Sequence, residues 1–358
     1  MSSPTDGPPA EITHLVRERT EARTRRDWAR ADALKGQIEA AGWRVVDHGS
    51  RTSVGPAAPA SIELDGELRY GAACAVPSLL DEPATTTWTV VLVASEEPER
   101  LSRLLGALRA HAPAGTQVVV AANDPSASQG RALASGSPDL APIGGVVPEV
   151  LRTSTRLGYA AALNIAMRRA AGEFVLLADN TALPTGDAFT SVEAALHDPA
   201  VAAAGGFGLT SAEPGPLRPN GLQPLDGDAS AVGEDADVAA LDAGWLAFRR
   251  SDYRDLGPFD EHFVTPAWLD VWWSLRLRAG AEPEGAEYVE PEGAGETEDS
   301  DAADPAAPEV QMPAPRRAVR LDLQLDRAEV PWPPDRSRLN RRNMYRVLDR
   351  FGWREDLA

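Results

Sequence analysis

Residues 88–94 read WTVVLVA, a run of apolar and β-branched residues that is typical of a strand buried on both faces of a sheet. Gln117–Ala122 and Glu173–Leu177 are runs of the same kind. Between the strands, Glu99–His111 carries leucines at helical spacing, and Gly158–Ala171 has the pattern of a second helix. This alternation predicts an α/β domain with a mostly parallel central sheet, whose functional side chains gather at the carboxyl ends of the strands.

Composition narrows the class of protein. The chain has 358 residues, enough for one large domain with a smaller one, and its net charge of −19 argues against a surface that binds nucleic acid or anionic lipid throughout. Because Cys74 is the only cysteine, neither an intrachain disulfide nor a thiolate metal site is available. The five histidines show no metal-ligand spacing. The apolar runs are far shorter than the roughly 20 residues that span a bilayer, and Met1–Ala10 lacks the features of a secretory signal, so we expect a cytoplasmic protein without a transmembrane segment.

The part of the chain before residue 88 divides into three zones. Residues 1–10 are expected to be disordered. Residues 11–48 carry apolar and small residues at helical spacing, which predicts a helical hairpin. Residues 49–87 are rich in Pro, Ala, Gly and Ser and are expected to form a linker, with a possible β-hairpin at 62–70 around an Asp-Gly pair.

Two zones of opposite charge follow the central one. Residues 281–315 contain eleven acidic residues and no Lys or Arg, which predicts a disordered loop that has too little apolar surface to fold. Residues 316–358 contain eleven arginines against seven acidic residues. We expect them to form an arm and a helix that pack on the α/β domain. The basic face of this helix could dock on the acidic loop or on phosphate groups, or it could simply face solvent.

The central zone resembles the family 2 glycosyltransferases, whose nucleotide-sugar-binding domain has the GT-A fold. The segments that match the family's motifs, in order along the chain, are 90–101, 156–164, 172–186, 243–250, 257–263 and 269–280. They include the strand that leads into the family's Asp-x-Asp metal loop and the helix that carries its acidic base. The resemblance implies a GT-A domain over residues 88–280, with the C-terminal arm packed against it.

The activity implied by this resemblance is the inverting transfer of a sugar from a nucleotide diphosphate-sugar donor to an unknown acceptor. A divalent cation, Mg²⁺ or Mn²⁺, would stabilise the departing diphosphate, and a carboxylate would take the proton of the acceptor hydroxyl. The matching motifs assign the base to Asp270 and the metal to Asp179 and Asn180. The donor-binding residues would be Glu96, Asn123, Asp124, Arg156, Gly158, Asn164, Asp179 and Asn180, and the acceptor-side residues Gly244, Trp245 and Trp272.

The chain also departs from the family's pattern. In Ala178-Asp179-Asn180, one carboxylate is out of register and an amide stands where a metal ligand is expected, so metal affinity should suffer. The segment that usually contains a histidine before the C-terminal arm is Leu321–Asp326, which has none.

Several candidate residues also have ordinary structural interpretations. Asp179 could be a turn residue, and Asn164 could hydrogen-bond a neighbouring loop. Asp270 could be a charge at a helix N-terminus, where the helix dipole stabilises it, and Trp272 could pack in the core. A catalytically degenerate GT-A scaffold that acts as an interaction protein is therefore an alternative function.

The N-terminal zone resembles a different family, since about residues 11–54 are similar to the helical tail at the C-terminus of cysteinyl-tRNA synthetases. No catalytic module of that enzyme is present, so aminoacylation is not implied. The basic side chains between Arg17 and Lys35 could contact RNA phosphates, although acidic residues interleave with them as on an ordinary solvated helix pair. An RNA- or tRNA-associated adaptor is thus a further alternative.

Overall fold

A ten-stranded mixed sheet organises the larger of two structural units. The structure is a computed structural model, and it describes residues 8–25, 27–48, 51–94, 97–211, 221–225, 235–280, 314–328, 334, 337–352 and 354–357. The two units are Met1–Glu63 and Leu64–Ala358, and each is described by itself. Residues 1–7 and 281–313, which make up most of the predicted disordered start and acidic loop, lie outside the described residues.

The smaller unit consists of two helices and a two-stranded antiparallel sheet. Its elements are α1 (Ala10–Thr24), α2 (Trp28–Ala40), β1 (Trp43–His48) and β2 (Arg51–Pro56). The Asp27 side chain caps α2 by accepting a hydrogen bond from the backbone N–H of Arg30 at 3.1 Å. Ile38 and Val45 are buried, and Val54 of β2 packs against their cluster.

The zone 49–87 is more structured than the linker expected from its composition. Besides β2 it contains β3 (Ile62–Leu64) and β4 (Glu67–Tyr70), which flank a turn at Asp65 and Gly66. These two turn residues have φ values of 55° and 75°, as a two-residue hairpin turn that follows the strand twist requires. Because β4 pairs in parallel with a strand of the large sheet, this hairpin extends one edge of that sheet.

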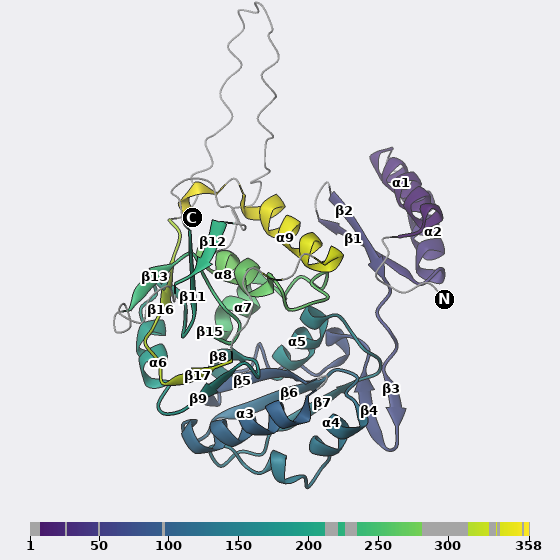
Figure 1. Cartoon of the computed structure of the whole chain (residues 1–358). Helices are drawn as coiled ribbons and strands as arrows, with labels where there is room; N and C mark the ends of the chain where they lie inside the picture. Colours follow the sequence, from purple (N-terminus) through teal and green to yellow (C-terminus); the bar gives the residue numbers. More distant parts are fainter. Residues whose placement is uncertain are drawn as a thin grey trace, which may run out of the picture. The chain divides into compact units, whose positions relative to one another are not determined.

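The large sheet has the strand order β13-β16-β10-β15-β8-β5-β6-β7-β4-β3 (Figure 1). Its strands after the hairpin are β5 (Thr86–Ala94), β6 (Gln117–Ala122), β7 (Glu149–Thr153), β8 (Gly172–Ala178), β10 (Val201–Gly205), β13 (Ala236–Val238), β15 (Trp245–Arg249) and β16 (Arg317–Arg320). Strands β8, β5, β6, β7 and β4 run parallel, whereas β15 is antiparallel to both β8 and β10. The predicted α/β class with a mostly parallel central sheet is confirmed.

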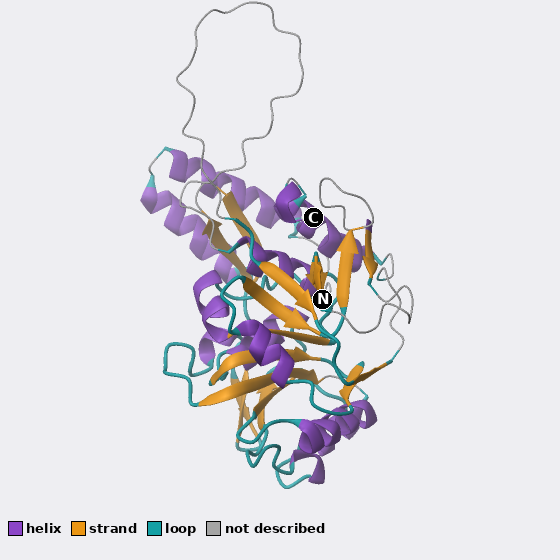
Figure 2. Ribbon diagram, turned by 90° about the vertical axis from the view of Figure 1, so that its left-hand side faces the viewer, coloured by secondary structure: helices purple, strands orange, loops and turns teal. Residues whose placement is uncertain are grey.

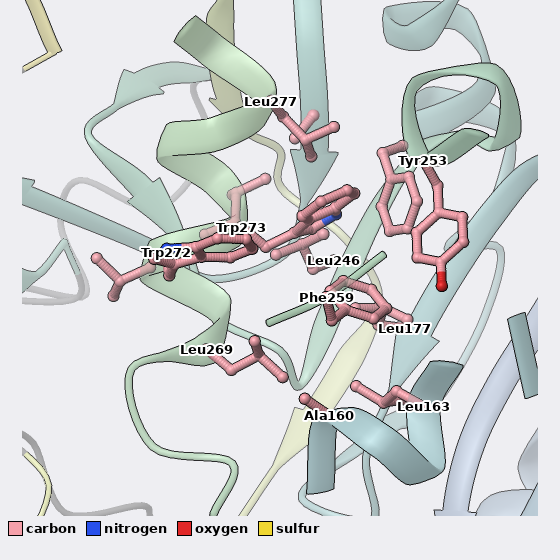
Figure 3. Close-up of a cluster of buried hydrophobic side chains, with 14 of the residues drawn as sticks. Ala160, Leu163, Leu177, Leu246, Tyr253, Phe259, Leu269, Trp272, Trp273 and Leu277 are labelled. Atoms are coloured by element: carbon pink, nitrogen blue, oxygen red, sulfur yellow. The ribbon is translucent and has the colours of Figure 1, made fainter. Parts of the chain in front are cut away.

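Helices cover both faces of this sheet, as Figure 2 shows. The buried leucines of α3 (Pro98–His111) share one hydrophobic cluster with α6 (Thr190–Leu196). On the other face lie α5 (Tyr159–Met167), α7 (Arg250–Leu256) and α8 (Leu269–Ala279). The aromatic centre of this second cluster is Trp273, whose ring packs edge-on against Phe259 with 4.7 Å between centroids (Figure 3).

The C-terminal arm takes part in the sheet structure of the larger unit. Strand β16 pairs in parallel with β10, and β17 (Leu325–Arg327) pairs antiparallel with β9 (Ala182–Pro184). Helix α9 (Arg338–Phe351) buries Val347 and Phe351 in the cluster around Trp273. A separate three-stranded sheet is formed by β12 (Leu222–Pro224), β11 (Gly208–Ser211) and β14 (Ala240–Leu241).

Among the described helices, none is both long enough and apolar enough to span a bilayer.

The packing predicts opposite effects for two glycine-to-alanine substitutions. At Gly172, the first residue of β8, an added Cβ would lie 2.5 Å from the backbone nitrogen of Thr89 and 2.7 Å from the carbonyl carbon of Trp88. Gly172→Ala should therefore lower the free energy of unfolding by about 1–3 kcal/mol. Gly106→Ala is the matched control, because Gly106 lies inside α3, where an added Cβ would meet no atom within 4 Å, and it should raise that free energy by about 0.5–1 kcal/mol. Urea denaturation of both variants measures the difference, and equal effects would contradict the packing of β8 against β5.

Candidate functional site

Three aspartates come together from separate segments of the larger unit. Asp179 follows the carboxyl end of β8, Asp242 follows β14, and Asp270 lies in the first turn of α8. The charge of Asp242 acts on the pKa of both other carboxyls. The position of Asp179 at the end of a parallel strand is where α/β sheets usually place their ligand-binding residues.

The backbone of the 242–244 loop contacts all three aspartates, Asp242 and Asp270 through their carboxylates and Asp179 through its main-chain N–H. The N–H of Ala243 donates to Oδ2 of Asp270 at 3.3 Å. The N–H of Gly244 donates to Oδ1 of Asp242 at 2.8 Å, and its carbonyl accepts the N–H of Asp179 at 3.5 Å. A Cβ at Gly244 would lie 3.0 Å from the Asp242 carboxylate, so a side chain at this position would crowd the loop.

Asp179 is held by its own turn. Its Oδ1 accepts hydrogen bonds from the backbone N–H of Thr181 at 2.7 Å and from the Thr181 hydroxyl. Burial raises the pKa of Asp179, and the charge of Asp242 adds to the rise, while the bonds from Thr181 and the charge of Arg327 oppose it. The pKa of Asp179 thus depends on its burial, on the hydrogen bonds of the turn and on the neighbouring charges.

Asp270 has the pKa of a group that can exchange protons near neutrality. Burial is the main cause that raises its pKa to about 7, and the nearby Asp242 carboxylate is the next. The backbone N–H groups of Ala243 and Val271 oppose this rise by donating to the carboxylate. Directly before α8, Trp268 has a φ of 70°, a rare conformation for a bulky residue, and its burial in the core holds the start of the helix in place.

Tyr159, the first residue of α5, belongs to the same electrostatic cluster. Burial raises the pKa of its hydroxyl, and the charges of Asp179, Asp270 and Asp242 raise it further. The hydroxyl therefore keeps its proton at neutral pH, where it can donate a hydrogen bond.

Arg327, the last residue of β17, supplies a positive charge to this cluster. Its Nη2 lies 2.8 Å from Oδ2 of Asp242, and both side chains are largely buried. The guanidinium carbon lies 4.1 Å from the centroid of the Phe207 ring, in a cation–π arrangement. The same charge lowers the pKa of Asp179.

Sequence reasoning missed Asp242, Arg327 and Tyr159. Asp242 stands one residue before the recognised segment 243–250, and an acidic residue next to an Ala-Gly pair was a signal available to find it. Arg327 directly follows the segment that lacks the usual histidine, but only the pairing of β17 with β9 shows that it reaches the site.

Asn164, predicted to bind the donor, instead joins α5 to the turn before α8. Its Nδ2 donates to the carbonyl of Phe259 at 3.0 Å and to Oε1 of Glu261 at 3.2 Å. Its Oδ1 accepts from the N–H of Phe259 at 3.0 Å and from the Tyr253 hydroxyl at 2.9 Å. Two donors and two acceptor positions are all that an amide offers, so these contacts use the full capacity of Asn164.

Asn123 and Asp124, also predicted on the donor side, follow the carboxyl end of β6. The Asn123 side chain holds the loop before α5 by donating to the Leu157 carbonyl at 3.0 Å and accepting its N–H at 2.8 Å. Asp124 has an exposed side chain, a φ of 47° and a backbone N–H that donates to the Thr153 hydroxyl at 3.0 Å. Asn123 is therefore engaged by the protein itself, whereas the Asp124 carboxylate faces solvent.

The two tryptophans expected on the acceptor side are buried. Trp245 is 0% exposed and packs edge-on against Phe189, with its indole N–H donating to the Ala188 carbonyl at 3.3 Å. Trp272 is 6% exposed and packs against Phe263 in the core shown in Figure 3. Neither indole face is open to a sugar, which corrects the expectation for both residues in favour of core packing.

The remaining predicted residues fall into three places. Asn180 is partly buried beside Asp179, and Gly244 lies in the 242–244 loop. Arg156 is exposed, and Gly158 directly precedes α5 at a position where a Cβ would lie 3.2 Å from the Cα of Val264. Glu96 lies outside the described residues.

The predicted metal ligands do not form a recognisable cation site. In the part of the chain that the structure describes, no three His, Cys, Asp or Glu side chains are grouped so that they could hold a metal ion. Of the six carboxylate oxygens of Asp179, Asp242 and Asp270, five accept hydrogen bonds from protein groups. The residues present therefore fit a divalent cation poorly.

The fold is similar to those of solved glycosyltransferase structures. The structure is similar to that of GalNAc-T7 with UDP, GalNAc and Mn²⁺, at a TM-score of 0.50 and 12% identity over 75% of this chain and 48% of the other. The larger unit has a GT-A-like fold. It also resembles S. aureus TarS 1–349 in complex with UDP, at a TM-score of 0.40 and 16% identity over 54% and 55% of the two chains. The mannosyltransferase PcManGT from Pyrobaculum calidifontis, in complex with GDP-Man and Mn²⁺, gives 0.37 and 20% over 56% of each chain.

These likenesses have a limited reach. The chain spans about half the length of the solved structures that it matches, and at such identities the likeness extends to the fold only. The family model of the cysteinyl-tRNA ligase anticodon binding domain matches residues 5–54, within the smaller unit. No curated protein sequence matches the chain.

The electrostatic arrangement predicts that Asp242→Asn lowers the pKa of the Asp270 carboxyl below about 7, because the substitution removes a negative charge that raises it. Titration of the aspartate side-chain carbons by NMR, with the Asp270 signal assigned through Asp270→Asn, measures this pKa. The control is Asp237→Asn, which removes an exposed carboxylate paired with Arg317. An Asp270 pKa that is the same in the wild type and in Asp242→Asn would contradict the coupling.

Proposed function

We propose that the larger unit is a glycosyltransferase that moves a sugar from a nucleotide diphosphate-sugar to an acceptor hydroxyl with inversion. The observation that carries this proposal is the carboxyl of Asp270 at the start of α8, which has a pKa of about 7 and interacts with the charge of Asp242 within a GT-A-like fold. A general base works best when its pKa is close to the working pH. The nucleotide diphosphate donor class is supported by the UDP that accompanies GalNAc-T7 in the structure of similar fold.

In the proposed reaction, Asp270 accepts the proton of the acceptor hydroxyl while that oxygen attacks the anomeric carbon of the donor. The new carbon–oxygen bond forms as the bond to the diphosphate breaks, and the nucleoside diphosphate leaves with the bonding electron pair. A single displacement of this kind inverts the configuration at the anomeric carbon. The 242–244 loop keeps the Asp270 carboxylate in position through the N–H of Ala243.

The reaction also needs positive charge near the departing diphosphate, because negative charge develops there as the bond breaks. The divalent cation that the resemblance implies, Mg²⁺ or Mn²⁺, would have Asp179 and Asn180 as ligands. Oδ1 of Asp179 already accepts two hydrogen bonds from Thr181, and the described residues supply no group of three ligands. No step of the mechanism is therefore assigned to a metal ion.

The proposed role of Asp270 predicts that Asp270→Asn binds a donor but loses turnover by about 10²–10⁴-fold, since general-base catalysis contributes factors of this size. Isothermal titration of the full chain with UDP-, GDP- and dTDP-sugars identifies a donor, and release of the nucleoside diphosphate with water as acceptor measures turnover. Because Asp270 must be deprotonated to act, the wild-type rate at limiting donor concentration, which reports on the free protein, should rise with pH through an apparent pKa of about 7 and then level off. Asp255→Asn, which alters an exposed carboxylate on α7, should leave both measurements unchanged.

Two outcomes would contradict this proposal. If the folded protein gives no heat with any of the three donor classes, the catalytically degenerate scaffold becomes the better interpretation. If a donor binds and Asp270→Asn turns it over as fast as the wild type, the base is another group.

A second candidate function, RNA binding by the smaller unit, is favoured by the anticodon-binding family model that matches residues 5–54. Trp28 is 57% exposed in this unit, and the guanidinium carbon of Arg23 lies 5.8 Å from its ring centroid. Exposed aromatic rings beside arginines are typical stacking platforms for unpaired bases.

This candidate predicts that the full chain binds tRNA with an affinity that falls as salt is raised, and that Trp28→Ala weakens binding by at least about fivefold, as the loss of one stacked base would. Filter binding at two salt concentrations measures both effects. Tyr345→Ala, which removes an exposed aromatic ring of the larger unit, serves as the control. No binding at low salt would end this candidate.

A further inference from the structure

We infer that Arg327 supplies the positive charge that stabilises the departing diphosphate, so that the donor binds without a divalent cation. This inference rests on the proposed glycosyl transfer and deepens it, because it names the group that recognises the diphosphate. Its basis is a mismatch between what a GT-A-like site would need for a metal and what this chain places there.

The carboxylates near the expected metal position already accept hydrogen bonds from other groups of the protein. The turn after β8 presents one carboxylate, Asp179, followed by the amide of Asn180. Thr181 donates two hydrogen bonds to the same oxygen of Asp179. The two other aspartates accept hydrogen bonds from the 242–244 loop, from the start of α8 and from Arg327. A divalent cation prefers several oxygen ligands that can surround it, and this arrangement does not offer them.

The backbone places Arg327 beside this turn. In the antiparallel pair of β17 with β9, Arg327 lies opposite Ala182, and the N–H of Ala328 donates to the carbonyl of Thr181 at 2.7 Å. Arg327 therefore lies beside the part of the chain that directly follows Asp179 and Asn180. Its position is set by main-chain hydrogen bonds and not only by the reach of a long side chain.

The side chain of Arg327 is held at its head group as well. Asp242 pairs with Nη2 at 2.8 Å, and the guanidinium lies over the ring of Phe207 at 4.1 Å. The side chain is 22% exposed. Because these contacts already restrict its rotamers, little conformational entropy remains to be lost when a ligand binds.

The chemistry of a guanidinium suits a diphosphate. It is charged at every physiological pH, and its planar fork of N–H donors matches two oxygens of a phosphate group. A fixed cation close to the departing oxygens stabilises the charge that develops there as the glycosidic bond breaks. Arg327 would thus be a catalytic residue that touches the leaving group.

Isothermal titration of the full chain with UDP and with GDP, in EDTA and again in Mn²⁺, tests the inference. We expect binding of one nucleotide in EDTA, with an affinity that changes by less than about threefold when Mn²⁺ is added. Arg327→Gln should weaken this binding by at least about tenfold, as expected for the loss of a charge-assisted hydrogen bond. Arg327→Lys should lie between the two, because it keeps the charge but loses the planar fork.

Two controls keep the result interpretable. Arg341→Gln removes an exposed arginine of α9 and should bind like the wild type. Thermal unfolding of each variant checks the fold. If Arg327→Gln unfolds, the wild type decides, because a requirement for Mn²⁺ in nucleotide binding would overturn the inference.

The outcomes separate this inference from the proposed function. Binding that is lost in EDTA, restored by Mn²⁺ and insensitive to Arg327→Gln would overturn the inference and leave the glycosyltransferase standing. If neither nucleotide binds in either buffer, the proposed function fails, and the role of Arg327 fails with it.

Discussion

The site depends on holding the Asp242 carboxylate near those of Asp179 and Asp270 against the repulsion between like charges. Asp242 raises the pKa of both Asp179 and Asp270, and the three together raise the pKa of Tyr159. The structure offsets this repulsion with N–H groups of the 242–244 loop and with the Arg327 guanidinium. Because these donors come from distant parts of the chain, the electrostatics of the site are inseparable from the tertiary fold.

The sheet could be predicted from sequence where strands are buried on both faces. Val90, Val119 and Leu176 lie in continuous apolar runs, and these runs became the central parallel strands. The short strands β9 and β17 carry no such signal, since three residues with mixed polarity gain their structure from pairing with a distant partner. Strand β2 likewise gains its structure by pairing with β1, so the composition of its zone, which indicates a linker, does not predict it.

The site was predicted only in part. Asp179 and Asp270 stand at positions that a motif can identify, and the structure relates them through Asp242. Asn164 and Trp245 also stand in recognisable motifs, yet their side chains hold a turn and fill the core. A motif identifies residues that a fold needs at fixed places, and it does not separate those that touch a ligand from those that position a loop. Hydrogen-bond partners and burial make that distinction.

Asp242 stands between the two charges that the proposed reaction needs, since it pairs with Arg327 and also raises the pKa of Asp270. When a diphosphate engages Arg327, part of the guanidinium charge is neutralised by the ligand, and the charge of Asp242 is compensated less. The electrostatic potential at the Asp270 carboxylate then becomes more negative, which raises its proton affinity. Donor binding would therefore strengthen the base that deprotonates the acceptor. A divalent cation bound only to the diphosphate and Asp179 would lack this link, because it would leave the pair of Asp242 and Arg327 intact.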